Sequence, residues 1–178
     1  SSLGAPIVQY KVCSTFDSSP EVGSIGQAID LGVRCTSAPW SPMVVGAPRL
    51  QRYQVFGHLF AAAQNEVWRI DRHPTMSRHP VTPMHESDLR LHLAQQTSRR
   101  NGLVHLGHMA QGQTDAVWQR LQGADQPVLM LDVADTATQR EAGRLVWDQR
   151  GPGVFSASSS GLQYALAEYW RSRGWLPE

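Results

Sequence analysis

The segment Ile7-Val8-Gln9-Tyr10-Lys11-Val12-Cys13-Ser14-Thr15-Phe16-Asp17-Ser18-Ser19-Pro20 joins an apolar run to a dense group of polar side chains. Residues 7–12 are typical of a β-strand, and residues 22–31 behind them have the apolar spacing of a helix. A strand that leads directly into a helix is the basic unit of an α/β protein. This first unit therefore indicates the fold class.

The rest of the chain repeats the same alternation. Short apolar runs that suit buried strands are separated by longer segments with helical spacing, which favours crossover connections between parallel strands. We therefore expect an α/β fold: a largely parallel sheet with helices on both faces, in three layers. The expected strands are residues 7–12, 43–46, 67–70, 103–106, 128–131 and 154–156, and the expected helices are 22–31, 86–96, 114–121, 136–147 and 162–173. Residues 53–63 are expected to be a loop followed by a helical turn.

Length and composition limit the class of protein. With 178 residues and 41% hydrophobic content, the chain suits a single domain. A net charge of +1 gives no electrostatic reason to expect nucleic acid or an anionic membrane as a partner. No apolar window is long enough for a membrane helix. We expect a soluble, cytoplasmic protein whose two cysteines, Cys13 and Cys35, are reduced.

Ligands of parallel sheets gather where strands end. This rule singles out the polar cluster after the first strand, in which Lys11 is the one lysine among sixteen basic residues. An ammonium group suits a carboxylate or a phosphate. A strand that runs into an ordinary hydroxyl-rich helix cap explains the same pattern. Two further segments, 158–161 and 23–26, suit either an anion or a simple helix cap.

The segment 71–84 is the second candidate region. It carries three prolines in ten residues, so neither a regular helix nor a central strand is expected there. Long irregular segments inside compact domains are often functional. Its arginines can bind carboxylates or phosphates, although Asp71 can also pair with them simply to hold the loop.

Three histidines, His73, His79 and His85, recur every six residues in and after this segment. That spacing matches no helical pair of metal ligands, and no cysteine lies near them. We therefore assign no metal site. Hydrogen bonds that fix the loop, or contact with a ligand, are the expected roles.

Two of these segments resemble a known family. Tyr-Lys-Val-Cys-Ser-Thr-Phe-Asp-Ser-Ser-Pro at 10–20 is similar to the substrate-binding domain of the four-carbon acid sugar kinases. So is Arg-Ile-Asp-Arg-His-Pro-Thr-Met-Ser-Arg-His-Pro-Val-Thr-Pro-Met at 69–84. The resemblance extends over essentially the whole chain.

The resemblance implies an ATP-dependent kinase, with Mg²⁺, that phosphorylates a hydroxyl of threonate, erythronate or an oxo-tetronate. It also implies that the opening strand with its Asp-Asp motif and the C-terminal nucleotide-binding domain are absent here. We therefore expect this chain to be inactive alone and to work with a nucleotide-binding domain or polypeptide. A homo-oligomer is a further expected arrangement.

The resemblance also implies residue roles. Lys11 would hold the substrate carboxylate, and the hydroxyl or backbone groups of Cys13, Ser14 and Thr15 would bind its oxygens. Asp17 would orient or deprotonate a hydroxyl. The residues that would complete the pocket or stabilise phosphate charge are Arg72, His73 and Arg78.

Two alternatives from other classes stay open. A sugar-acid-binding protein without catalysis would keep the binding half alone, which fits the lack of a phosphate-cradling lysine loop. An interaction domain derived from such a kinase would fit the six tryptophans.

Overall fold

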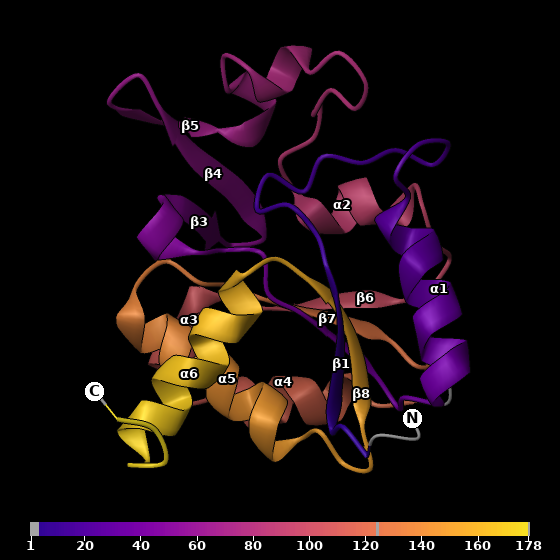
Figure 1. Ribbon diagram of the computed structural model, residues 1–178, viewed down its shortest axis with the longest axis vertical. Coiled ribbons are helices and arrows are strands. Elements are labelled where there is room, and N and C mark those ends of the chain that lie inside the picture. Colours follow the sequence, from indigo (N-terminus) through magenta and orange to yellow (C-terminus); the bar gives the residue numbers. More distant parts are fainter. Residues whose placement is uncertain (1–3, 124, 178) are drawn as a thin grey trace.

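A computed structural model of the protein describes residues 4–123 and 125–177. Five parallel strands form its central layer (Figure 1). β1 pairs with β8, and β7 lies between β2 and β6. The predicted parallel sheet is confirmed. Its strands are β1 (Ile7–Lys11), β2 (Ser41–Met43), β6 (Asn101–Val104), β7 (Val128–Leu131) and β8 (Val154–Ser158).

Serine hydroxyls join β8 to β2, which lie side by side. Ser41 Oγ donates to the carbonyl of Phe155 on β8 at 2.7 Å, and Ser156 Oγ donates to the carbonyl of Pro42 at 2.7 Å. Ser158 Oγ accepts from the backbone N–H of Val44 at 2.8 Å. Because Pro42 has no N–H to give to a strand ladder, the buried serines supply the hydrogen bonds that unite the two halves of the sheet. We call these contacts the serine seam.

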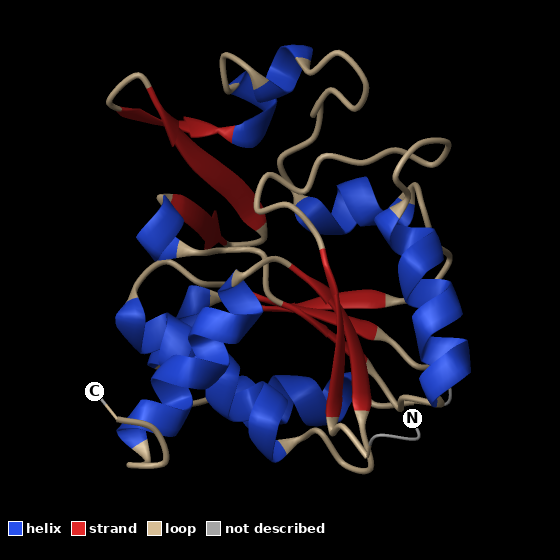
Figure 2. Cartoon of the chain, in the orientation of Figure 1, coloured by secondary structure: helices blue, strands red, loops and turns tan. Residues whose placement is uncertain are grey.

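Helices cover both faces of the sheet, so the predicted three-layer arrangement is confirmed (Figure 2). Met43 and Met130 belong to the core beneath α1, whereas Val44 and Leu129 belong to the core beneath α5 and α6. One face carries α1 (Ile25–Thr36) and α2 (Leu89–Ala94), and the other carries α3 (Leu106–Ala110), α4 (Thr114–Leu121), α5 (Thr136–Asp148) and α6 (Gly161–Ser172). None of the helices in the described residues is long and apolar enough to cross a bilayer.

A second, antiparallel sheet stands beyond the carboxyl ends of the parallel strands (Figure 1). The expectation of a helical turn within residues 53–63 is therefore wrong. Both hairpin turns contain two residues with positive φ: Phe56 (50°) with Gly57 (83°), and Gln64 (54°) with Asn65 (63°). Such turns match the twist of paired strands. The strands are β3 (Arg52–Val55), β4 (His58–Ala63) and β5 (Glu66–Arg69).

Asp132, at the end of β7, ties this antiparallel sheet to the parallel one. Its fully buried carboxylate accepts backbone hydrogen bonds from Phe56 at 2.5 Å, Gly57 at 3.0 Å and Leu106 at 3.3 Å. Burial raises the pKa of Asp132, while the three N–H groups work in the opposite direction. The β3–β4 turn is thereby fixed above the central strand.

The two segments weighed as anion sites are helix starts. Ser24 caps α1, because its side chain accepts from the backbone N–H of Gln27 at 3.2 Å. At α6, Ser159 Oγ accepts from the N–H of Gly161 at 2.9 Å, and a Cβ on Gly161 would lie 2.1 Å from the Gly46 carbonyl oxygen. Local packing thus explains both segments.

The serine seam generates a stability expectation. Ser158→Ala leaves the N–H of Val44 buried without an acceptor, so the free energy of unfolding should fall by about 1–3 kcal/mol in urea titrations. Ser98→Ala is the matched control, since Ser98 is exposed. Equal stability of the two variants would contradict the role given to the seam.

Candidate functional site

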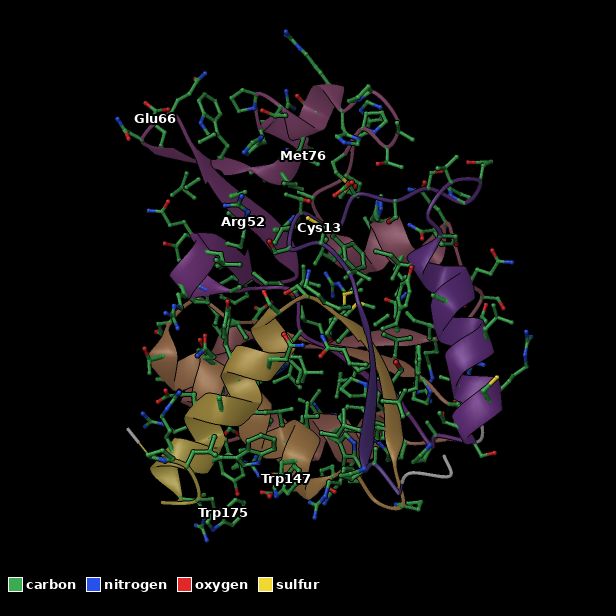
Figure 3. The ribbon with its side chains drawn as sticks, in the orientation of Figure 1. Cys13, Arg52, Glu66, Met76, Trp147 and Trp175 are labelled. Carbon is green, nitrogen blue, oxygen red and sulfur yellow. The ribbon has the colours of Figure 1, made fainter. Side chains whose placement is uncertain are left out.

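The loop after β1 presents the first group of candidate residues. Lys11 is the last residue of β1, and no hydrogen bond or ion pair among the described residues uses its exposed ammonium. Cys13 is exposed as well, whereas Phe16 is fully buried with a φ of 57°. The buried Phe16 anchors the loop and leaves the flanking polar groups at the carboxyl edge of the sheet (Figure 3).

Asp17 is the centre of a hydrogen-bond network. Thr15 Oγ1 donates to Asp17 Oδ1 at 2.5 Å and lies 3.0 Å from Cys13 Sγ. Thr82 Oγ1 donates to the other carboxylate oxygen, Oδ2, at 3.2 Å. His79 Nδ1 accepts from the N–H of Thr82 at 3.1 Å and fixes that residue in turn. Each carboxylate oxygen has two lone pairs, so Asp17 is held in place with capacity left for a ligand hydroxyl.

Ser18 fastens the same loop to α2. Its hydroxyl donates to the Phe16 carbonyl and accepts from Gln96 Nε2 at 2.9 Å. The single proton of Ser18 is thereby used, so the nearby His92 Nε2, at 3.0 Å, must be the donor in their contact. His92 is buried, and burial lowers its pKa. A neutral histidine therefore supports the loop.

The proline-rich segment is irregular, as predicted, with two 3₁₀ turns at Ile70–Arg72 and Met76–Arg78. Asp71 binds Arg69 through two hydrogen bonds of 2.7 Å, which lower the pKa of Asp71, and it lies 3.6 Å from Arg72. The pairing of Asp71 with arginine that we weighed as a purely structural role is thus present.

His73 and Arg78, the other two candidates in this segment, differ in their exposure to solvent. His73 is buried, and its Nδ1 accepts from the backbone N–H groups of Thr75 and Met76, each at 3.2 Å. Arg78 is exposed. Within the described residues, no hydrogen bond or ion pair joins Lys11 to Arg72, His73 or Arg78. Hydrogen bonds join Asp17, Thr15 and Cys13, whereas within the part of the chain that the structure describes none links these three to Lys11, Ser14, Arg72, His73 or Arg78.

The repeating histidines do not converge. His73 and His79 each use Nδ1 to accept backbone hydrogen bonds, and His85 lines a small cavity with Thr82. No group of three or more His, Cys, Asp or Glu side chains suited to a metal ion occurs in residues 4–123 and 125–177.

Sequence reasoning missed Thr82, which binds Asp17, and His92, which supports the same loop through Ser18. The expectation that His79 fixes the loop through hydrogen bonds is confirmed. Thr82 is 65 residues from Asp17, and no local pattern marks such a pair. A cavity of about 200 Å³ lies beside the network, lined by Ser18, Ser19, Pro20, Thr82, Pro83, His85, Glu86, His92 and Gln95.

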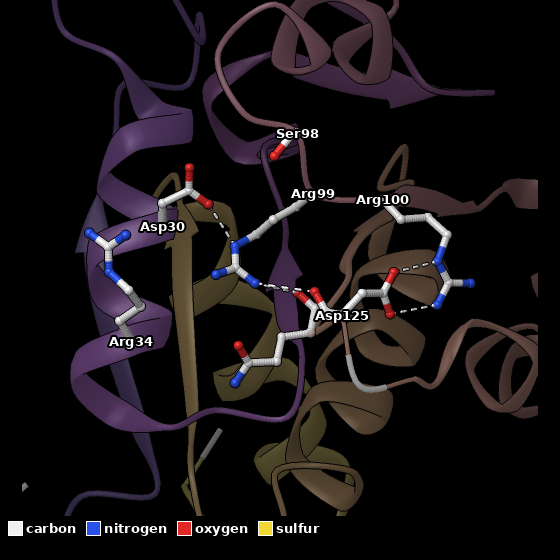
Figure 4. A pocket seen from close by; sticks show the side chains of 7 residues that line it. Asp30, Arg34, Ser98, Arg99, Arg100 and Asp125 are labelled. Atoms are coloured by element: carbon white, nitrogen blue, oxygen red, sulfur yellow. Dashed lines mark hydrogen bonds and ion pairs between the residues drawn. The ribbon is translucent and has the colours of Figure 1, made fainter.

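A larger hollow of about 570 Å³ lies at the opposite, amino edge of the sheet (Figure 4). Four of its charged groups are paired with one another: Arg99 Nε lies 2.6 Å from Asp30, and Arg100 lies 2.8 Å from Asp125. These ion pairs join loops before β6 and β7 to α1. Size alone therefore does not make this hollow the better candidate.

Comparison with known proteins identifies relatives over almost the whole chain. A family model described as "Sugar-binding N-terminal domain" matches residues 1–166. The chain is 64% identical over 176 residues to a 3-oxo-isoapionate kinase from Paraburkholderia graminis, which covers 99% of this chain and 37% of that protein. It is 32% identical over 164 residues to a 3-oxo-tetronate kinase from Pectobacterium atrosepticum, covering 90% of this chain and 36% of that protein. The chain thus spans little more than a third of these relatives' lengths.

Solved structures share the fold. A Haemophilus influenzae protein matches with a TM-score of 0.81 and 22% identity, covering 97% of this chain and 40% of that one. A Bordetella bronchiseptica protein, described as a domain-swapped dimer with bound citrate, matches with a TM-score of 0.66 and 20% identity, covering 95% of this chain and 37% of that one.

The buried His92 generates a pH expectation. Because its pKa is lower in the folded state than the value of about 6.5 in an unfolded chain, the folded state binds fewer protons, and stability is lost as the pH falls below about 6.5. Between pH 7.5 and pH 5.5, the melting temperature of His92→Gln should fall less than that of the native chain. The glutamine amide can still donate a hydrogen bond to Ser18. The control is His85→Gln at an exposed histidine. An unchanged pH dependence in His92→Gln would refute this role.

Proposed function

This chain belongs to the family of sugar-binding N-terminal domains, and from that premise we propose that it is the substrate-binding part of an ATP-dependent sugar-acid kinase. The substrate would be a small sugar acid with a keto group, of the kind named for the 3-oxo-isoapionate and 3-oxo-tetronate kinases. The 64% identity favours the first of these over a linear four-carbon acid. The reaction would transfer a phosphoryl group to one of its hydroxyls.

One observation carries the proposal beyond family membership. At the carboxyl end of β1, the Lys11 ammonium has no hydrogen bond or ion pair with the residues that the structure describes, and the loop that follows carries a carboxylate held by two threonines. A small sugar acid needs one cation for its carboxylate and fixed hydrogen-bonding groups for its hydroxyls. Lys11 and Asp17 supply these two functions.

The remaining roles follow from exposure and hydrogen bonding. Ser14 and the backbone of Cys13 would bind substrate oxygens beside Thr15, whose own proton is engaged by Asp17. Asp17 would orient the hydroxyl that is phosphorylated. Arg72 and Arg78, which are exposed, would meet the negative charge of the transferred phosphate, and His73 would line the pocket from within.

ATP and Mg²⁺ would be held elsewhere. The described residues offer no cluster of carboxylate or histidine ligands for a metal ion, and phosphoryl transfer requires metal and cationic groups around the phosphates. We propose that a nucleotide-binding domain or polypeptide supplies them, so that this chain as a single domain is inactive alone. A cytoplasmic location would give it access to ATP.

A second copy of the chain is a further proposed partner. Phe56 and Val67 are 54% and 55% exposed, on or beside the antiparallel sheet. Exposed large apolar side chains of this kind can be covered by a second copy of the chain.

The binding role can be tested by thermal unfolding with 3-oxo-isoapionate, 3-oxo-tetronate, threonate and Mg-ATP. A sugar acid at about 100 times its Kd should add about 2.7 kcal/mol of stability, which is a rise of about 5–10 °C. Lys11→Ala should lose this rise because the carboxylate loses its counter-charge. Mg-ATP alone should have no effect.

Arg34→Ala is the matched control, since it removes an exposed cation at the opposite edge of the sheet. Stabilisation of the native chain that Lys11→Ala retains in full would contradict the site. Stabilisation by no sugar acid at all would contradict the proposed function.

A further inference from the structure

Most of the buried polar atoms without partners lie in or beside the antiparallel sheet. Among the described residues, seven buried side-chain nitrogen or oxygen atoms lack a hydrogen-bond partner. Four of them belong to Arg52, Gln54 and His73, and the other three are single atoms on α4 and α6. Unpartnered buried polar groups cost about 1–3 kcal/mol each. Such a concentration points to a missing partner.

The three side chains share one location. Arg52 and Gln54 alternate along β3 and therefore point to the same face of the antiparallel sheet. That face packs inward, since their cross-strand neighbours Ala61 and Leu59 are fully buried. His73 ends the 3₁₀ turn Ile70–Arg72 that follows β5. Burial has the largest effect in lowering the pKa of His73, and the charge of Arg52 lowers it further.

Gln54 also lies at the carboxyl edge of the central strand. Its backbone N–H donates to the carbonyl of Val133 at 2.9 Å, and its carbonyl accepts from the N–H of Val133 at 3.1 Å. Val133 follows β7 by two residues. The carboxyl edge of a parallel sheet is where ligands bind, so the orphaned atoms are in the place expected for a ligand.

Arg52 and His73 each have one N–H donor without an acceptor. Arg52 Nη1 already donates to the carbonyls of Leu50 and Gln51, at 2.8 and 3.3 Å, which leaves Nε without an acceptor. His73 Nδ1 accepts backbone N–H groups, so the proton of the neutral ring is on Nε2. The nearby Ala62 backbone raises the pKa of His73, against the effect of burial. Nε2 nevertheless has no hydrogen-bond partner of normal geometry among the described residues.

Gln54 provides a hydrogen-bond acceptor, whereas Arg52 and His73 provide donors. Its amide lies near enough to Asp132 to lower the pKa of that carboxyl, yet neither of its polar atoms has a hydrogen-bond partner. Its Oε1 is an acceptor that is fully buried. The three side chains therefore offer two donors, Arg52 Nε and His73 Nε2, and one acceptor, Gln54 Oε1.

A carbonyl oxygen beside a hydroxyl group complements this set. The carbonyl can accept from both donors, and the hydroxyl can donate to the amide oxygen. We infer that Arg52, Gln54 and His73 form a subsite for the hydroxyketone part of the sugar acid, separate from the carboxylate at Lys11. The inference rests on the proposed function, because it assigns part of the same substrate.

The test measures the affinity of the whole chain for 3-oxo-isoapionate and 3-oxo-tetronate by calorimetry, and the melting temperature without ligand. Gln54→Met keeps the length of the side chain and removes its polar atoms. Affinity should fall about tenfold through the lost hydrogen bond, while the ligand-free melting temperature stays equal or rises. Arg52→Lys should also weaken binding, since it keeps a donor for the Leu50 carbonyl but loses Nε–H. Gln27→Met, at an exposed position on α1, should change neither quantity.

The outcomes separate the inference from the function on which it rests. If the native chain binds and Gln54→Met binds equally well, ordered water satisfies these atoms and the subsite is wrong. If Gln54→Met loses melting temperature together with affinity, Gln54 is structural and the subsite is again wrong. If the native chain binds no sugar acid, the proposed function itself fails.

Discussion

The serine seam between β8 and β2 is the interaction on which the arrangement depends. Pro42 prevents a regular ladder there, and buried hydroxyls from Ser41, Ser156 and Ser158 supply the hydrogen bonds instead. Beyond the strand ends, Ser159 adds two more hydrogen bonds, from its N–H to the Val44 carbonyl and from its Oγ to the Val45 carbonyl. Together these contacts connect the pair β1–β8 to β2, β7 and β6. The seam therefore sets the position of the loop after β1, with Lys11 and Asp17, relative to the end of β7 and the antiparallel sheet above it.

Much of the fold could be predicted from the sequence because the strand and helix periods are distinct. Residues 114–121, 128–131 and 136–147 match α4, β7 and α5 within one residue. The antiparallel sheet could not be found in this way. Ala61, Ala62 and Ala63 favour helix in isolation, and only pairing with β3 and β5 makes them a strand.

The candidate site was predictable only in part. The strand-end rule located residues 13–17, and the prolines marked 71–84 as irregular. The contact between Asp17 and Thr82 depends on packing across 65 residues of chain, which no local pattern contains. Gln54 carries no signal in the sequence either, since its importance comes from complete burial without a hydrogen-bond partner.

The central claim is that the sugar acid binds at the carboxyl edge of the sheet, between the loop after β1 and the antiparallel sheet. Backbone amide NMR spectra of the labelled chain, titrated with 3-oxo-tetronate, test it most directly. We expect saturable shifts in residues 11–17, at Gln54, His73 and Thr82, and none at the amino edge. Shifts confined to Arg34, Arg99 and Arg100, around the larger hollow, would contradict it.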